Sequence, residues 1–249
     1  MVQLVGILNV TPDSFSDGGE FLDPEVAIAR VEQLFKDGAN LVDIGAESTR
    51  PNAQVLSDDE EWKRLEPILR NLIPSYPGKL SLDTYHPATV KKAWAIGPVI
   101  INDVTGFNNL EMIKLAADLH ATVIVSHLPA GMTIQQAHIL TPVQTVGQVK
   151  DDLLKKAAEL IRAGLTHTQI ILDPGIGFGK TPEVNKQLVG FGKLVPQYSV
   201  MIGYSRKRFL GDTRMELATN LEAGRIAVKQ GAVYLRVHDV KGHSVLNES

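Results

Sequence analysis

Short apolar runs of strand length alternate along the chain with amphipathic stretches of helical length. The apolar runs fall at residues 3–8, 41–44, 80–82, 99–101, 122–125, 170–172, 200–202 and 234–237. Between them, residues 25–36 and 149–162 have the clearest helical periodicity. Repeated β-α units predict an α/β fold with a parallel sheet, either closed into a barrel or open and wound on both faces. Eight strands favour the (β/α)₈ TIM barrel.

The last apolar run is followed by only the residues 238–249, so the final helix is expected to be shortened or absent. A dimer contact or a rearranged tail should then cover the apolar flank between the last and first strands. The 249 residues contain no linker or low-complexity tract. They are therefore expected to form a single barrel domain over 1–249.

Composition narrows the function classes. Hydrophobic residues make up 44% and charged residues 21% of the chain, which is typical of globular proteins. The net charge of -3 gives no basic field for nucleic acid, and the lack of cysteine excludes disulfides, thiolate catalysis and thiolate-bound zinc. No leader-like segment or long apolar stretch predicts a membrane association. A cytoplasmic location is the expectation.

Polar side chains follow every apolar run. They are Asn9, Asp43, Asp83, Asn102, Ser126 with His127, Asp173, Ser205, and His238 with Asp239. Any one of them alone could cap a helix or begin a turn. Because the carboxyl ends of barrel strands gather on one face, all of them together predict a site there.

Three of these groups stand in strongly apolar surroundings: Asp83 in LSLDT, Asn102 in VIIND and Asp173 in IILDP. Buried carboxylates and amides need hydrogen-bond partners, and losing one partner costs about 1–3 kcal/mol. A heterocycle with a guanidine-like edge of N–H donors would satisfy two carboxylates and an amide. A pterin has such an edge.

Cations follow the seventh and eighth runs, in YSRKRF at 204–209 and RVH at 236–238. They favour an anionic ligand such as a diphosphate, although a solvated run of charges is the alternative for the first segment. The glycine-rich DPGIGFGKT at 173–181 has Pro174 where a phosphate loop needs glycine, and Lys180 where a dinucleotide motif does. It could equally be a turn that places Phe178 at the rim of a pocket.

The seven histidines form no HExxH pair, which disfavours a zinc ion held by the protein alone. Magnesium held mainly by substrate phosphates remains open. The sequence also has no nucleophile with an adjacent base, so a covalent enzyme intermediate is not expected.

Seven segments, in order from the first strand to the last, strongly resemble dihydropteroate synthases. They are GILNVTPDSFSDGG at 6–19, VDIGAESTRP at 42–51, SLDT at 81–84, INDVTG at 101–106, LDPGIGFGK at 172–180, YSRK at 204–207 and RVHDV at 236–240. The resemblance implies a homodimeric TIM barrel. It also implies condensation of 6-hydroxymethyl-7,8-dihydropterin diphosphate with para-aminobenzoate to give 7,8-dihydropteroate and diphosphate, in folate biosynthesis and as a target of sulfonamides.

The resemblance assigns roles residue by residue. The pterin edge is assigned to Asp83, Asn102, Asp173 and Lys207, with Arg236 stacked over the ring. Diphosphate and Mg²⁺ are assigned to Asn9, His238 and Arg236, with Asn9 as the metal ligand and with Asp43 and Ser205 nearby. The enclosure of aminobenzoate is assigned to Phe15, Asp17, Thr49, Arg50, Pro51 and Phe178.

Arg208 is expected to meet the aminobenzoate carboxylate, at the amino terminus of the helix after the seventh strand, with an outward-facing surface arginine as the alternative. The groups expected to act in catalysis are Asn9, Asp83, Lys207, Arg236 and His238. The preferred route is dissociative: diphosphate leaves first, and the acidic pocket stabilises a pterin carbocation until the arylamine attacks.

Some positions depart from the family pattern. Ala46 replaces a frequent glycine, SHLPAGM at 126–132 is atypical, residues 215–231 differ from the usual small-residue helix, and the tail after Val240 is short. A catalytically silent pterin-binding relative and a methyltetrahydrofolate-type methyltransferase are therefore kept as alternatives. Fusion to, or association with, the preceding pathway kinase is a further possibility.

Overall fold

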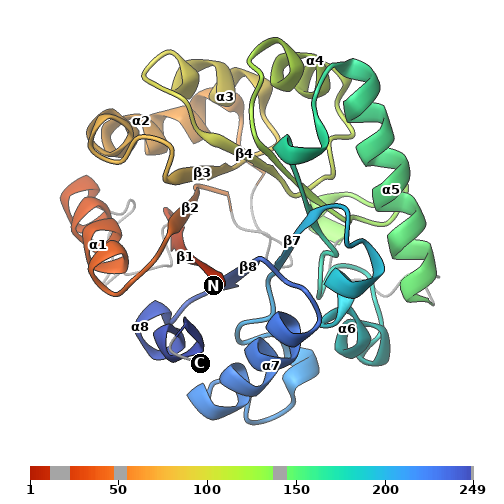
Figure 1. Ribbon diagram of the computed structural model, residues 1–249. Coiled ribbons are helices and arrows are strands. Elements are labelled where there is room, and N and C mark those ends of the chain that lie inside the picture. The colour runs from red at the N-terminus through yellow and green to blue at the C-terminus, as the bar shows by residue number, and fades with distance from the viewer. Residues whose placement is uncertain (12–22, 48–54, 137–144, 248–249) are drawn as a thin grey trace.

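The computed structural model describes residues 1–11, 23–47, 55–136 and 145–247. Eight parallel strands close a barrel, each paired with its neighbours in the chain and β8 with β1 (Figure 1). The strands are β1 (Gln3–Asn9), β2 (Leu41–Gly45), β3 (Leu80–Asp83), β4 (Ile100–Asp103), β5 (Val123–Ser126), β6 (Ile170–Asp173), β7 (Ser199–Ile202) and β8 (Tyr234–Val237). The predicted closed barrel is confirmed, and the open sheet is excluded.

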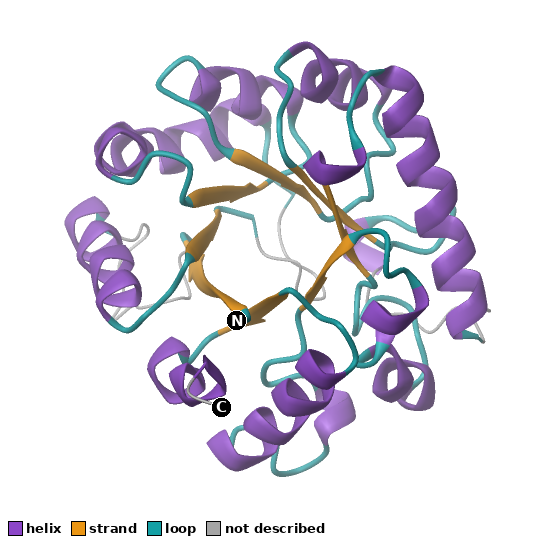
Figure 2. Cartoon of the chain, viewed as in Figure 1, coloured by secondary structure: helices purple, strands orange, loops and turns teal. Residues whose placement is uncertain are grey.

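Helices form an outer ring around the strands (Figure 2). They are α1 (Pro24–Lys36), α2 (Asp58–Ser75), α3 (Pro87–Trp94), α4 (Leu110–Asp118), α5 (Val146–Ala163), α6 (Pro182–Leu188), α7 (Leu217–Lys229) and α8 (Val240–His243). Short 3₁₀ segments are η1 (Ile134–Gln136), η2 (His167–Gln169), η3 (Phe191–Leu194), η4 (Arg208–Leu210) and η5 (Ser244–Asn247). None of the helices in the described ranges has both the length and the apolar character that a membrane span requires.

Local sequence determines where the long helices begin. Ser57 caps α2 by accepting a hydrogen bond from the backbone of Glu60, whose side chain accepts one from the Ser57 backbone in return. Thr145 and Gln148 form the same reciprocal pair at the start of α5. These caps satisfy backbone N–H groups that would otherwise lack partners, so each helix starts at a defined residue.

The barrel interior is apolar at the amino ends of the strands. Side chains alternate along each strand, so every second residue points inward. The inward apolar groups pack into a cluster separate from the main core: Val5, Leu41, Ile124, Ile171 and Met201, with Ile100 and Tyr234 against them. This cluster forms a floor, and the polar residues further along the same strands lie above it.

The final helix is shortened, as predicted: α8 has 4 residues and runs into η5. It lies outside β1 and β8 (Figure 1). Val240 is 1% exposed, and Leu246 packs against the core. A Cβ on Gly6 of β1 would lie 3.2 Å from Val240 Cγ2 and 3.1 Å from a Leu34 methyl group, so glycine lets both side chains approach the strand. The chain after β8 therefore covers the apolar flank between β8 and β1.

Candidate active site

A polar cavity of about 240 Å³ opens at the carboxyl ends of the strands. Its walls are Ile7, Asn9, Thr11, Glu47, Asp83, Asn102, Val104, Ser126, Asp173, Gly175, Phe178, Gly203, Lys207, Arg236 and His238. All the strands except β2 contribute to the wall directly or through the residues just beyond their ends, and β2 contributes through Glu47 in the connection that follows it. The predicted clustering on one face is observed for Asn9, Asp83, Asn102, Ser126, Asp173 and His238. His127 instead contacts Asp152 on α5, and Asp239 caps α8.

Asp43 lies beneath this cavity and is fully buried. One of its oxygens, Oδ2, accepts hydrogen bonds from Arg236 Nε at 2.6 Å and from Asn102 Nδ2 at 3.0 Å. The other oxygen accepts one from the Ser81 hydroxyl. Asp43, which the sequence predicts as a substrate contact, is not part of the cavity wall. It lies below the wall and accepts hydrogen bonds from two wall residues, Arg236 and Asn102.

Arg236 bridges two carboxylates, because its Nη2 also donates to Asp83 Oδ2 at 2.9 Å. Burial disfavours its charge, but Asp43 and Asp83 outweigh that penalty and raise the pKa of Arg236. Burial and the neighbouring Asp43 charge raise the pKa of Asp83, and Arg236 offsets only part of the increase. The pair therefore gives the cavity a fixed cation and an acceptor that holds a proton more readily than an ordinary aspartate.

Lys207 and Asp173 form the part of the wall that belongs to β7 and β6, beside Arg236 on β8. Burial lowers the pKa of Lys207 to about 8, even though Asp173 favours the charged form. Burial raises the pKa of Asp173, and Lys207 acts against that increase. The Lys207 amine donates to the Ile176 carbonyl and lies 5.3 Å from the centre of the Phe178 ring. Asp173 and Lys207 both line the cavity at the carboxyl ends of the strands, and their contact with a pterin stays a prediction.

The glycine-rich segment after β6 is a folded turn. Asp173 Oδ1 accepts a hydrogen bond from Gly175 N at 2.7 Å, and a Cβ on Gly175 would lie 2.1 Å from the His127 carbonyl. Only glycine fits there. Lys180 Nζ donates to the carbonyls of Gly175 and Phe178 at 2.9 Å each and of His127 at 3.2 Å. This lysine, whose role the sequence reasoning missed, fixes the turn that carries Phe178 into the cavity wall.

His238 faces the cavity next to Ser205. The Ser205 hydroxyl lies 3.1 Å from His238 Nδ1, and Ser205 is itself buried and outside the wall. Burial, with the nearby cations Arg206 and Arg236, lowers the pKa of His238 to about 4. His238 is therefore neutral at pH 7 and acts as a hydrogen-bonding group.

Arg208 is not at the start of a long helix. It begins the three-residue segment η4, whereas α7 starts at Leu217, so the predicted helix terminus is wrong. Its side chain is exposed and does not contribute to the cavity wall. Its predicted contact with the aminobenzoate carboxylate stays a prediction.

Five predicted residues lie outside the described residues: Phe15, Asp17, Thr49, Arg50 and Pro51. The sequence reasoning missed Glu47 as a wall residue, together with Ile7, Thr11, Val104 and Gly203. Inward alternation along β1 could have identified Ile7, since it stands two residues before Asn9. Glu47 lies beyond β2 in a connection, where alternation carries no information.

Residues 5–238 match the family described as pterin binding enzyme. The dihydropteroate synthase of Neisseria meningitidis serogroup C is 39% identical over 96% of this chain and 88% of its own length. The chain belongs to the dihydropteroate synthases of this family.

Solved structures of dihydropteroate synthases agree with the barrel. The Xanthomonas albilineans enzyme with 4-aminobenzoic acid has a TM-score of 0.88 and 35% identity, covering 98% of this chain and 90% of that one. The same enzyme in complex with 7,8-dihydropteroate has a TM-score of 0.84 and 31% identity, covering 99% of this chain and 93% of that one. The predicted family and fold are both confirmed.

Proposed function

We propose that this chain, a transferase of the dihydropteroate synthase family, joins 6-hydroxymethyl-7,8-dihydropterin diphosphate to para-aminobenzoate by a dissociative route. The observation that carries the proposal is that one barrel cavity brings together the acceptors Asp83, Asn102 and Asp173 with the cations Lys207 and Arg236. Similar chains support the two halves of the reaction, since one neighbouring structure contains 4-aminobenzoic acid and another 7,8-dihydropteroate.

Asp83, Asp173 and Asn102 would bind the N–H edge of the pterin. Asn102 uses its amide nitrogen on Asp43, which leaves Oδ1 buried with no hydrogen-bond partner among the described residues. A buried acceptor without a partner is costly, and a ligand N–H group would satisfy it. Lys207 would donate to the same heterocycle, and Arg236 would stack over its face.

In the reaction, the bond between the pterin methylene carbon and the diphosphate oxygen breaks, and diphosphate keeps the electron pair. The arylamine nitrogen then donates its lone pair to that carbon, and its surplus proton passes to diphosphate or water. Asp83 and Asp173 would stabilise the positive charge on the pterin between these steps. Asn9, His238 and Arg236 would bind the departing diphosphate.

Asn9 is the residue that would hold Mg²⁺. Its side chain is exposed in the cavity wall, and the described parts of the chain contain no group of three carboxylate or histidine side chains that could cage a metal. A single amide oxygen fits an ion that takes its other ligands from phosphate and water. When bound, Mg²⁺ would neutralise charge on the leaving diphosphate.

Para-aminobenzoate would enter above the pterin, against Phe178 and the residues Phe15, Asp17, Thr49, Arg50 and Pro51 of the first two connections. Sulfonamides would compete for the same space. A homodimer and a link to the preceding pathway kinase complete the proposal and rest on the family resemblance, while a cytoplasmic location stays the expectation from the sequence.

The test is direct. Purified protein incubated with pterin diphosphate, para-aminobenzoate and Mg²⁺ should yield dihydropteroate, identified by mass. Asp173→Asn should lose the product, whereas Asp151→Asn, at a carboxylate that is 75% exposed on α5, should not. Pterin binding without product would favour a silent relative, and methyl transfer after addition of a corrinoid protein would favour the methyltransferase.

A further inference from the structure

Glu47 is a wall residue of the cavity whose carboxylate is held from three sides. Its Oε1 accepts a hydrogen bond from the Tyr85 hydroxyl at 2.6 Å, and its Oε2 accepts one from Leu56 N at 3.1 Å. His86 Nε2 lies 3.5 Å from the same Oε2. The Glu47 side chain is only 7% exposed. Such a carboxylate has one fixed orientation.

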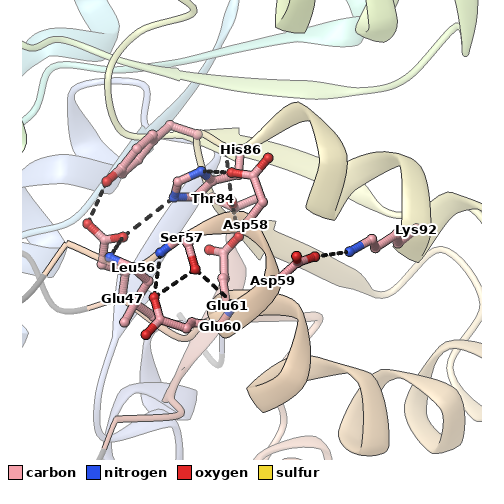
Figure 3. Close-up of polar contacts among 11 residues, drawn as sticks. Glu47, Leu56, Ser57, Asp58, Asp59, Glu60, Glu61, Thr84, His86 and Lys92 are labelled. Carbon is pink, nitrogen blue, oxygen red and sulfur yellow. Dashed lines mark hydrogen bonds and ion pairs between the residues drawn. The ribbon is translucent and has the colours of Figure 1, made fainter.

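His86 lies between two carboxylates. Its second ring nitrogen, Nδ1, is 2.6 Å from Oδ1 of Asp58, the first residue of α2 (Figure 3). The contact with Glu47 raises the pKa of His86 above its usual value, because it outweighs the effect of burial. Burial in turn opposes the charge of Glu47, but the contacts with His86, Tyr85 and Leu56 prevail and lower the pKa of Glu47.

These contacts join two connections of the barrel. The chain leaves β2 through Glu47 and returns towards α2 through Leu56, so the bond between them closes the base of the β2α2 connection. Tyr85 and His86 belong to the neighbouring β3α3 connection and occur directly after Asp83 and Thr84. The orientation of a wall residue on one connection is therefore set by side chains on another.

The wall that Glu47 forms is nearer the mouth than the pterin-edge groups. Gly45 ends β2, and Glu47 stands two residues beyond it, whereas Asp83, Asn102 and Asp173 are still within their strands. A substrate that enters after the heterocycle has filled the deep part of the cavity must pass this level. In the proposed reaction, that substrate is the arylamine.

We propose that Tyr85 and His86 are positioning residues that fix Glu47 at the mouth of the cavity and thereby set the fit of the arylamine substrate. The inference rests on the proposed function and adds two residues to it. Its physical basis is preorganisation: a wall residue that is already held in place costs no ordering when the second substrate binds.

The charge on His86 makes the positioning of Glu47 depend on pH. The groups that face His86 are Glu47 from the β2α2 connection, Asp58 and Glu61 from α2, and Tyr85 beside it. The pKa of His86 is raised on folding. The charged contact between His86 and Glu47 is therefore fully present below pH 6.5 and is lost as pH rises through the pKa of His86 in the folded chain. The KM for para-aminobenzoate should rise over that range.

Three variants test the proposal, with a matched control. Tyr85→Phe should raise the KM for para-aminobenzoate by about 10-fold, the effect of losing one hydrogen bond to a charged group. His86→Gln, which removes the charge 3.5 Å from Glu47 Oε2, should raise it as well. The KM for the pterin diphosphate should be unchanged in both variants. Asp58→Asn should lower the pKa of His86 measured by NMR. Asp59→Asn removes the next carboxylate of α2, which is 93% exposed and paired with Lys92, and should alter neither quantity.

The pH profile separates positioning from simple destabilisation. His86→Gln should abolish the alkaline rise in the KM for para-aminobenzoate, whereas a variant that only weakens the fold would keep it. Equal effects on both KM values, or none in Tyr85→Phe and His86→Gln, would overturn the inference. Failure of the parent protein to form dihydropteroate would instead overturn the proposed function, and the NMR titration of His86 would still report on the contacts.

Discussion

Replacing Asp43 tests whether the buried layer beneath the cavity organises the site. Asparagine keeps the shape of the side chain and removes its charge. Its amide oxygen can take the position that accepts from Arg236 and Asn102, and its NH₂ can donate to the Ser81 hydroxyl, which is able to reverse its role. Asp43→Asn therefore loses charge but few hydrogen bonds. Alanine loses both.

The magnitudes follow from these contacts. Hydrogen bonds to a charged group are about twice as strong as neutral ones, and Arg236 retains Asp83 in either variant, so Asp43→Asn should cost about 2 kcal/mol. Asp43→Ala leaves three buried donors without an acceptor and should cost about 4–5 kcal/mol, as for breaking a buried pair. In a chain of this size, these values correspond to decreases in Tm of roughly 4–8 °C and 8–20 °C.

The assay is thermal unfolding followed by steady-state kinetics. Both variants should lower kcat/KM, because Arg236 loses one of the two carboxylates that fix it, and alanine should do so more. Asp151→Asn, at an exposed carboxylate, should change the free energy of unfolding by less than about 0.5 kcal/mol. Equal Tm values for the asparagine and alanine variants, or a parental Tm in both, would refute the view of Asp43 as the organising acceptor.

Further predictions concern the cavity wall and its support. Asp83→Asn and Asp173→Asn should each abolish calorimetric binding of a pterin analogue, because asparagine presents donors where only acceptors fit; unchanged affinity would remove them from the pterin edge. Burial lowers the pKa of Lys180 to about 7 from 10.5, so the unfolded chain binds more protons between these values and stability should rise with pH there, by up to ~1.4 kcal/mol per unit. Lys180→Met should lose the part of this rise in unfolding free energy that Lys180 causes, while the rise caused by Lys207 should remain in both the variant and the parent protein. Arg208→Ser should raise the KM for para-aminobenzoate by no more than about fivefold, since exposed pairs contribute ~0–1 kcal/mol, and an unchanged KM would assign Arg208 to the solvent.

The barrel could be predicted from sequence because its signals are local. Each strand is marked by an apolar run, polar residues lie at or just beyond the end of each run, and the segments between the runs are long enough for a helix, so the order and type of the elements follow from the pattern. The polar residues Asp83 and Asp173 are the last positions of their strands. Alternation then points them inward, and barrel closure brings them together.

The supporting contacts could not be predicted, because they join residues that are distant in sequence. Nothing around Asp43 indicates that it accepts from Arg236, which is 193 residues away. In the sequence, Lys180 stands in a glycine-rich segment that resembles an anion-binding loop. In the structure, its amine donates to three backbone carbonyls instead. The position of Arg208 shortly after the seventh strand predicts a helix start there, but the chain forms η4 at Arg208 and α7 begins only at Leu217.

The geometry of Arg236 connects the buried layer to the chemistry above it. Its Nε and Nη2 both donate to carboxylates, one on β2 and one at the end of β3, and the N–H groups that form these bonds lie in the plane of the guanidinium group. Two bonds in one plane fix that plane, so the face of the group has a single orientation in the cavity wall. A planar heterocycle then meets a cation that is already oriented and needs no rearrangement to stack. Asp43 and Asp83 thus determine the position of Arg236 before any substrate binds, which is why a change at buried Asp43 should affect catalysis as well as stability.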